Sequence, residues 1–160
     1  MTLSQSLTNL GDAVREEKLL SDKLTIDEMA DVLSSKNDLS DELTTSLFTE
    51  RLSITGNNDG FVFKRTSNTG ISRAALNFNT SNIKGRTIRI YFQAYANSTD
   101  EVSINIAQAG GLKSRVSIKS GTMRGYFVTL KLVINASLSI YLLDKDSSIT
   151  IKDLRAWFIS

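Results

Sequence analysis

The chain of 160 residues has no cysteine and no histidine. Without cysteine it can form neither a disulfide nor a thiolate metal site, and cysteine usage does not reveal its redox compartment. Without histidine it lacks the commonest general base and the commonest metal ligand. No apolar stretch reaches the roughly 18 residues that a membrane-spanning helix needs. These absences count against most nucleophilic and metal-dependent enzymes, and against a membrane partner.

The N-terminus also lacks the basic region followed by an apolar run that marks a secretory signal. We therefore expect synthesis in the host cytoplasm without a signal peptide. Charge is unevenly distributed: residues 1–50 hold four Lys/Arg and eleven Asp/Glu, whereas residues 51–160 hold fifteen and six. The net charges are thus −7 and +9, which predicts two parts with different partners. The basic part either favours an anionic ligand or complements the acidic part at an interface.

Few carboxylates remain for catalysis in the basic part. Its acidic residues fall mainly in predicted turns, at Asp100-Glu101 and at Asp144 and Asp146. A glycosidase needs two carboxyl groups at close range, one of them in apolar surroundings that raise its pKa. We therefore predict that the protein is not an enzyme.

Residues 1–36 are expected to form a helical segment for anchoring or oligomerisation. Apolar residues recur there at helical spacing, and Thr25 and Glu28 form a capping box before the second set. The apolar positions are Leu3, Leu7, Leu10, Val14, Ile26, Met29 and Leu33. Helices this short are not stable alone in water. They pack either as a hairpin within the chain or on other subunits, so a homo-oligomer is one expectation.

Residues 37–46 are polar and are interpreted as a linker. From residue 47 the pattern changes to alternation, and turn signals separate about nine short candidate strands. The expected strands are 47–54, 60–66, 71–78, 86–96, 101–108, 112–119, 125–134, 137–143 and 149–159. Short strands without intervening helices predict an antiparallel β-sandwich or barrel over residues 47–160.

The strand at 86–96 is the most informative. Its even positions are apolar, and its odd positions from 89 to 95 are Arg89, Tyr91, Gln93 and Tyr95. Tyrosine rings stack on sugar faces, and Arg and Gln hydrogen-bond hydroxyls, so this face is a candidate saccharide platform. A contact between sheets or subunits explains the same residues equally well.

Neighbouring strands could extend this platform with Asn105 and Tyr141, which share the polar register of their own strands. If a bulge near Asp153 keeps Leu154, Ala156 and Phe158 inward, Trp157 points outward and joins it; a buried core tryptophan is the favoured alternative. Aromatic residues beside arginine can also stack nucleic-acid bases. The basic residues are spread over many strands, so nucleic acid is not an expected partner.

Three stretches of the second part, residues 85–95, 125–134 and 148–157, resemble jelly-roll carbohydrate-binding modules related to families 4, 9 and 22. The resemblance departs from the family at Tyr126, where tryptophan is usual. It implies a jelly-roll sandwich that binds saccharide. It also places Asp153 where relatives hold a structural calcium ion, although one carboxylate without partners favours an ordinary turn residue and no cofactor.

Residues 7–15 and 22–33 resemble a helical segment at the N-termini of tail and baseplate proteins of phages of Gram-positive bacteria. Two separated blocks agree in order and approximate spacing. This resemblance implies a virion protein that contacts other virion proteins through its N-terminal helices and host cell-wall saccharide through its sandwich. The alternative is a purely structural head fibre or decoration protein without glycan binding. A third reading is a carbohydrate-binding accessory of a bacterial enzyme system.

Overall fold

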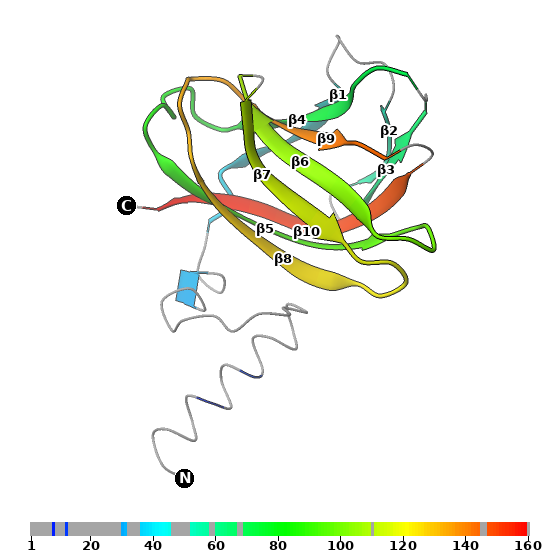
Figure 1. The fold of residues 1–160 in the computed structure, drawn as a ribbon. Helices are drawn as coiled ribbons and strands as arrows, with labels where there is room; N and C mark the ends of the chain where they lie inside the picture. Colours follow the sequence, from blue (N-terminus) through cyan, green and yellow to red (C-terminus); the bar gives the residue numbers. More distant parts are fainter. Residues whose placement is uncertain are drawn as a thin grey trace.

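The computed structural model describes residues 8, 12, 30–31, 36–45, 52–57, 60–66, 69–109, 111–144 and 147–159. Ten strands are defined there, and no helix (Figure 1). The strands are β1 (Leu39–Thr45), β2 (Leu52–Asn57), β3 (Gly60–Arg65), β4 (Ser72–Phe78), β5 (Thr87–Ala96), β6 (Val102–Gln108), β7 (Gly111–Ile118), β8 (Arg124–Lys131), β9 (Leu138–Leu142) and β10 (Ser148–Ile159).

The strands form two antiparallel five-stranded sheets, in the orders β1-β4-β9-β6-β7 and β2-β3-β10-β5-β8. Figure 1 shows one sheet lying over the other. Alternation along the strands explains the packing, because every second side chain of β4, β5, β6 and β9 is buried. The inward apolar side chains of both sheets form one core. The predicted antiparallel β-sandwich is therefore confirmed.

Strand β5 lies inside its sheet, between β8 and β10. Ile88, Ile90, Phe92 and Ala94 point into the core and have no exposed surface. The even positions of this strand were predicted to face inward, and they do. Its odd positions therefore lie on the outer face of the β2-β3-β10-β5-β8 sheet.

The predicted linker at residues 37–46 is wrong, because it contains β1, which pairs with β4. The chain is held here by an open edge of β10. Strand β3 pairs only with residues 148–151 of β10, so the backbone groups beyond them need other partners. Ala156 N donates to Asn37 Oδ1 (3.1 Å), Asp38 N donates to Ala156 O (2.7 Å), and Phe158 N donates to Asp38 Oδ2 (3.2 Å). Sequence alternation predicts nine strands because this tenth strand depends on tertiary pairing.

Most of the N-terminal segment lies outside the described residues. Thr8, Asp12, Ala30 and Asp31 have helical backbone conformation as isolated positions and define no element. The predicted helices, with their apolar positions from Leu3 to Leu33, stay a prediction. Within the part of the chain that the structure describes, no helix has the length and apolarity needed to cross a membrane.

Candidate saccharide-binding surface

A row of four polar side chains crosses the outer face of the β1-β4-β9-β6-β7 sheet. Arg73 on β4 lies opposite Tyr141 on β9, and Tyr141 lies opposite Asn105 on β6. Arg115 on β7 completes the row opposite Asn105. Strands are spaced about 4.8 Å apart, so the row is roughly 14 Å long.

Hydrogen bonds tie the row together in two pairs. The Arg73 guanidinium donates to the Tyr141 hydroxyl (3.4 Å), and Arg115 Nε donates to Asn105 Oδ1 (3.1 Å). Arg73, Asn105 and Tyr141 are half-buried, and Arg115 is exposed. An aromatic ring between guanidinium and amide groups can stack on a sugar ring and hydrogen-bond its hydroxyls.

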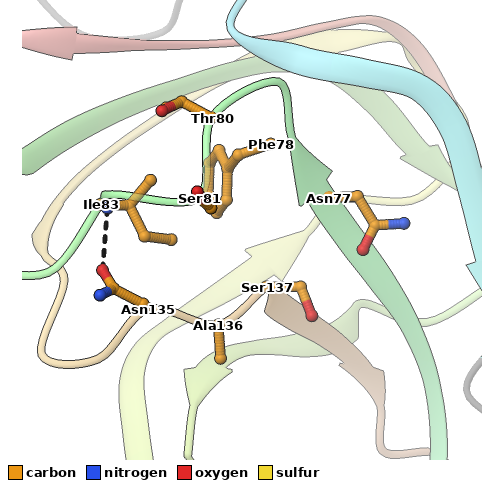
Figure 2. Close-up of a pocket in the computed structure, with 8 residues that line it drawn as sticks. All are labelled: Asn77, Phe78, Thr80, Ser81, Ile83, Asn135, Ala136 and Ser137. Carbon is orange, nitrogen blue, oxygen red and sulfur yellow. Dashed lines mark hydrogen bonds between the residues drawn. The ribbon is translucent and has the colours of Figure 1, made fainter.

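A polar pocket lies at the end of β4 and the start of β9 (Figure 2). Arg73, Ala75 and Asn77 share the outer face of β4, because the intervening residues are buried. With a rise of about 3.3 Å per residue, Asn77 stands roughly 13 Å from Arg73. The pocket is lined by amide and hydroxyl side chains with Phe78, Ile83 and Ala136: Asn77, Thr80, Ser81, Asn135 and Ser137 supply the polar groups.

Hydrogen bonds of the exposed Asn135 and the buried Gln108 preform this pocket. Asn135 Oδ1 accepts hydrogen bonds from Ile83 N (2.9 Å) and Lys84 N (2.7 Å), which ties the β8–β9 loop to the β4–β5 loop. Gln108 is 2% exposed, accepts from Val133 N, and donates to the carbonyls of residues 134 and 136. Both loops are therefore held before any ligand arrives.

The middle of this surface carries small side chains. Ala75 on β4 lies opposite Ser139 on β9, and Ser139 lies opposite Ala107 on β6. This row of small residues lies between the Arg73–Tyr141 pair and the pocket, and its side chains are too short to block the path from one to the other. A linear oligosaccharide could therefore contact both ends at once.

The sequence prediction divided its candidates incorrectly between the sheets. Asn105 and Tyr141 belong to β6 and β9, which pair with each other and not with β5. They lie on the opposite side of the sandwich from Arg89, Tyr91, Gln93 and Tyr95. Strand order arises from long-range pairing, which local alternation does not encode.

The predicted platform on β5 is largely covered. Tyr91 has no exposed surface, Trp157 is 5% exposed, and the two form a second apolar cluster with Phe127 and Ile159. Gln93 donates to the Tyr91 hydroxyl (3.1 Å), and Arg89 forms an ion pair with Asp31. Gln93 and Tyr95 are half-buried. Rings buried in this way cannot stack on a sugar unless their cover moves.

The bulge near Asp153, which the sequence analysis gave only as a condition for an outward Trp157, is present. The β10–β5 register shifts between Lys152 and Arg155, and Asp153 has φ of +48°. Beyond it Ala156 enters the core, so Trp157 lies on the outer side of the sheet, although it is buried there. Asp153 accepts a hydrogen bond from Arg155 Nε (2.6 Å). The described residues contain no group of three or more carboxylates that could hold a metal ion.

Sequence reasoning missed several residues of the outer face of the β1-β4-β9-β6-β7 sheet and its pocket, which together are called the open face below. Arg73, Arg115, Asn77 and Asn135 were not among the candidates. Arg73 and Asn77 stand at the polar positions of the alternation in β4, so the pattern contains a signal for them. Asn135 lies in a loop, where periodicity gives none.

Comparisons with known proteins agree on the architecture. No protein-family model matches the chain, and no curated protein matches its sequence. The apo CBM1 module of BiXyn10A aligns with a TM-score of 0.55 and 14% identity, over 79% of this chain and 100% of that one. The N-terminal cellulose-binding domain of Cellulomonas fimi β-1,4-glucanase C aligns with a TM-score of 0.53 and 12% identity, over 78% and 93%. The sandwich has the fold of a carbohydrate-binding module.

A point variant of the family 29 module CBM29-2, complexed with cellulohexaose, aligns with a TM-score of 0.53 and 10% identity, over 76% of this chain and 89% of that one. At these identities the likeness concerns the fold alone. The jelly-roll sandwich expected from the sequence resemblance is therefore confirmed, whereas the ligand of this chain is a separate question.

Proposed function

We propose that this chain is a non-enzymatic phage virion protein of a tail, baseplate or fibre whose sandwich binds host cell-wall saccharide. The observation that carries the binding proposal is the Arg73–Tyr141–Asn105–Arg115 row, which is accessible and leads along β4 and β9 to a polar pocket. Aromatic, amide and guanidinium groups together suit a flat ligand rich in hydroxyls. The fold of carbohydrate-binding modules supports the same ligand class.

The virion assignment rests on the N-terminal resemblance to tail and baseplate proteins. Residues 1–36 would connect the module to other virion proteins or to further copies of the chain, and the protein would reside in the virion. The scarcity of carboxylates in residues 51–160, which hold only six, supports a role in holding a saccharide rather than cleaving it.

Cosedimentation with purified cell walls of a Gram-positive host tests the binding proposal. We expect the full chain to sediment with the walls, and Arg73→Ala with Tyr141→Ala to abolish this. Tyr95→Ala is the matched control, because it removes a half-buried tyrosine from the opposite face. Far-UV circular dichroism confirms that each variant is folded.

Failure of the wild type to bind walls would refute the proposal and favour the structural head-fibre or decoration role. Loss of binding in Tyr95→Ala but not in the Arg73 and Tyr141 variant would return the site to the β5 face. Turnover of wall polysaccharide by the wild type would contradict the non-enzymatic assignment.

A further inference from the structure

The outer face of the β2-β3-β10-β5-β8 sheet carries the apolar cluster of Tyr91, Phe127, Trp157 and Ile159. Tyr91 lies opposite Phe127 on the neighbouring strand. The rings of Trp157 and Phe127 pack edge to face, with their centres 6.0 Å apart. The Arg89 guanidinium lies 5.8 Å from the centre of the Phe127 ring. This is a compact aromatic surface on the side of the sheet away from the core.

The burial of this cluster requires a cover. Side chains on the outer face of a sheet stand roughly perpendicular to it, so neighbours within the sheet shield their flanks and leave their tips open. Tyr91 nevertheless has no exposed surface, and Trp157 is only 5% exposed. The second sheet of the sandwich lies on the other side and cannot supply the cover. Phe127 and Ile159 pack beside the two rings and Gln93 reaches the Tyr91 hydroxyl, and a segment outside the two sheets would complete the cover.

One described residue from outside the sheets reaches this face. Asp31 accepts a hydrogen bond from the Arg89 guanidinium, 58 positions away in sequence, and the two side chains are 39% and 17% exposed. In Figure 1 the short piece at residues 30–31 lies beyond the β2-β3-β10-β5-β8 sheet, on the side away from the other sheet. Asp31 therefore lies at the outer face of this sheet, at the Arg89 side chain beside the aromatic cluster.

Charge also favours a cover from the N-terminal part of the chain, to which Asp31 belongs. Residues 1–35 hold three Lys/Arg and seven Asp/Glu, a net charge of −4, and residues 36–160 hold sixteen and ten, a net charge of +6. Two further cations belong to β10: Arg155 lies opposite Tyr91, next to Arg89, and is paired with Asp153, and Lys152 lies farther along, opposite Gln93. No residue in the described part of the chain offers an acceptor to the buried Trp157 indole N–H. An acidic segment would supply negative charge to this face.

We propose that the acidic N-terminal segment, residues 1–35, docks on the outer face of the β2-β3-β10-β5-β8 sheet of its own chain. The Arg89–Asp31 ion pair fixes its position, and its apolar side covers Tyr91 and Trp157. This goes beyond saccharide binding: one face of the sandwich is a docking surface for the segment, and only the opposite face is left for a ligand.

Trp157 is the only tryptophan, so its fluorescence in the full chain reports this contact directly. Arg89→Glu and Asp31→Lys should each shift the emission to the red and raise acrylamide quenching roughly twofold or more, because local opening exposes the indole. Combining the two reversals should restore the wild-type values. Arg124→Glu, an exposed charge reversal at the start of β8, should change nothing. Unchanged quenching in both single variants would overturn the proposal.

Cross-linking in the full chain tests the docking without relying on a charge reversal that could unfold it. The chain has no native cysteine, so Asp31→Cys with Arg89→Cys creates the only reactive pair. A short bismaleimide should give a cross-link within one chain, visible as a monomer by denaturing gel and mass spectrometry. The pair Asp31→Cys with Arg124→Cys is the control and should give none. Cross-linked dimers alone, or no cross-link, would overturn the proposal.

Discussion

The two outer faces of the sandwich carry nearly the same chemistry in opposite states. Each has a tyrosine directly beside arginine and amide side chains: Tyr91 near Arg89 and Gln93, and Tyr141 near Arg73 and Asn105. Tyr91 is fully buried and Tyr141 is half-buried. Residue type therefore does not distinguish a ligand surface from a docking surface. The two surfaces are distinguished by whether another part of the chain covers the outer side of the sheet.

The largest expected difference between the faces concerns stability. Tyr91→Ala should lower the free energy of unfolding by about 3 kcal/mol or more, because removing a buried aromatic ring costs roughly 3–5 kcal/mol. Tyr141→Ala should cost about 1 kcal/mol or less, the usual scale of a cross-strand pair on an open face. Urea unfolding followed by far-UV circular dichroism measures both. Equal losses would show that the faces are equally buried.

A smaller loss is expected when the pocket of the open face is released. Asn135→Ala removes the acceptor of Ile83 N, in a part-buried bond, and of Lys84 N, in an exposed one, and we expect a loss of about 0.5–1.5 kcal/mol. Thermal unfolding would detect it as a lower Tm. Asn97→Ala is a matched control, because Asn97 bonds exposed partners at Ser148 and Thr150. An unchanged Tm for Asn135→Ala would mean that the two loops are held without it.

Arg115 should affect binding without affecting the fold. Its side chain is exposed, so Arg115→Ala should change stability by no more than about 0.5 kcal/mol. Its affinity for wall saccharide should fall roughly five- to tenfold, which corresponds to about 1–1.4 kcal/mol. Binding isotherms with solubilised wall polysaccharide measure this change. Full affinity in Arg115→Ala would shorten the proposed surface to Arg73, Tyr141 and the pocket.

On the covered face, a much smaller stability effect is expected at Arg89 than at Tyr91. Its ion pair with Asp31 is partly exposed, and such pairs contribute about 0.2–1 kcal/mol. Arg89→Ala should therefore change the free energy of unfolding by about 1 kcal/mol, far less than Tyr91→Ala, since aromatic burial dominates this face. A loss as large as that of Tyr91→Ala would give the ion pair, rather than the rings, the main role in holding the cover.

Alternation predicted the elements that local sequence controls. The inward positions of β5 were predicted and are confirmed, and the bulge at Asp153, considered as the condition for an outward Trp157, is present. Strand β1 was missed because an open edge of β10 holds the preceding residues in place. The pairing of β6 with β9 was missed for a similar reason: register and order depend on partners far along the chain.

The residues of the candidate site are brought together mainly by long-range strand pairings that the sequence did not predict. Tyr141 and Asn105 were proposed, but beside the wrong strand, and Arg73 joins them only through the β4–β9 pairing. The burial of Tyr91 and Trp157 involves Phe127 and Ile159 of other strands, and Arg89 pairs with the distant Asp31; no pattern within β5 indicates these contacts. Sequence thus predicted the inward face of the sandwich better than its outward faces.

An NMR titration tests the central claim most directly. Soluble fragments of host cell-wall polysaccharide would be added to the isotopically labelled full chain, and backbone amide shifts would be followed. The account predicts concentration-dependent shifts at Arg73, Asn105, Tyr141 and Asn135, with Gln93, Tyr95 and Lys152 unchanged. Shifts confined to Gln93, Tyr95 and Lys152 would contradict it. So would the absence of any shift when the fragments come from cell walls that bind the full chain.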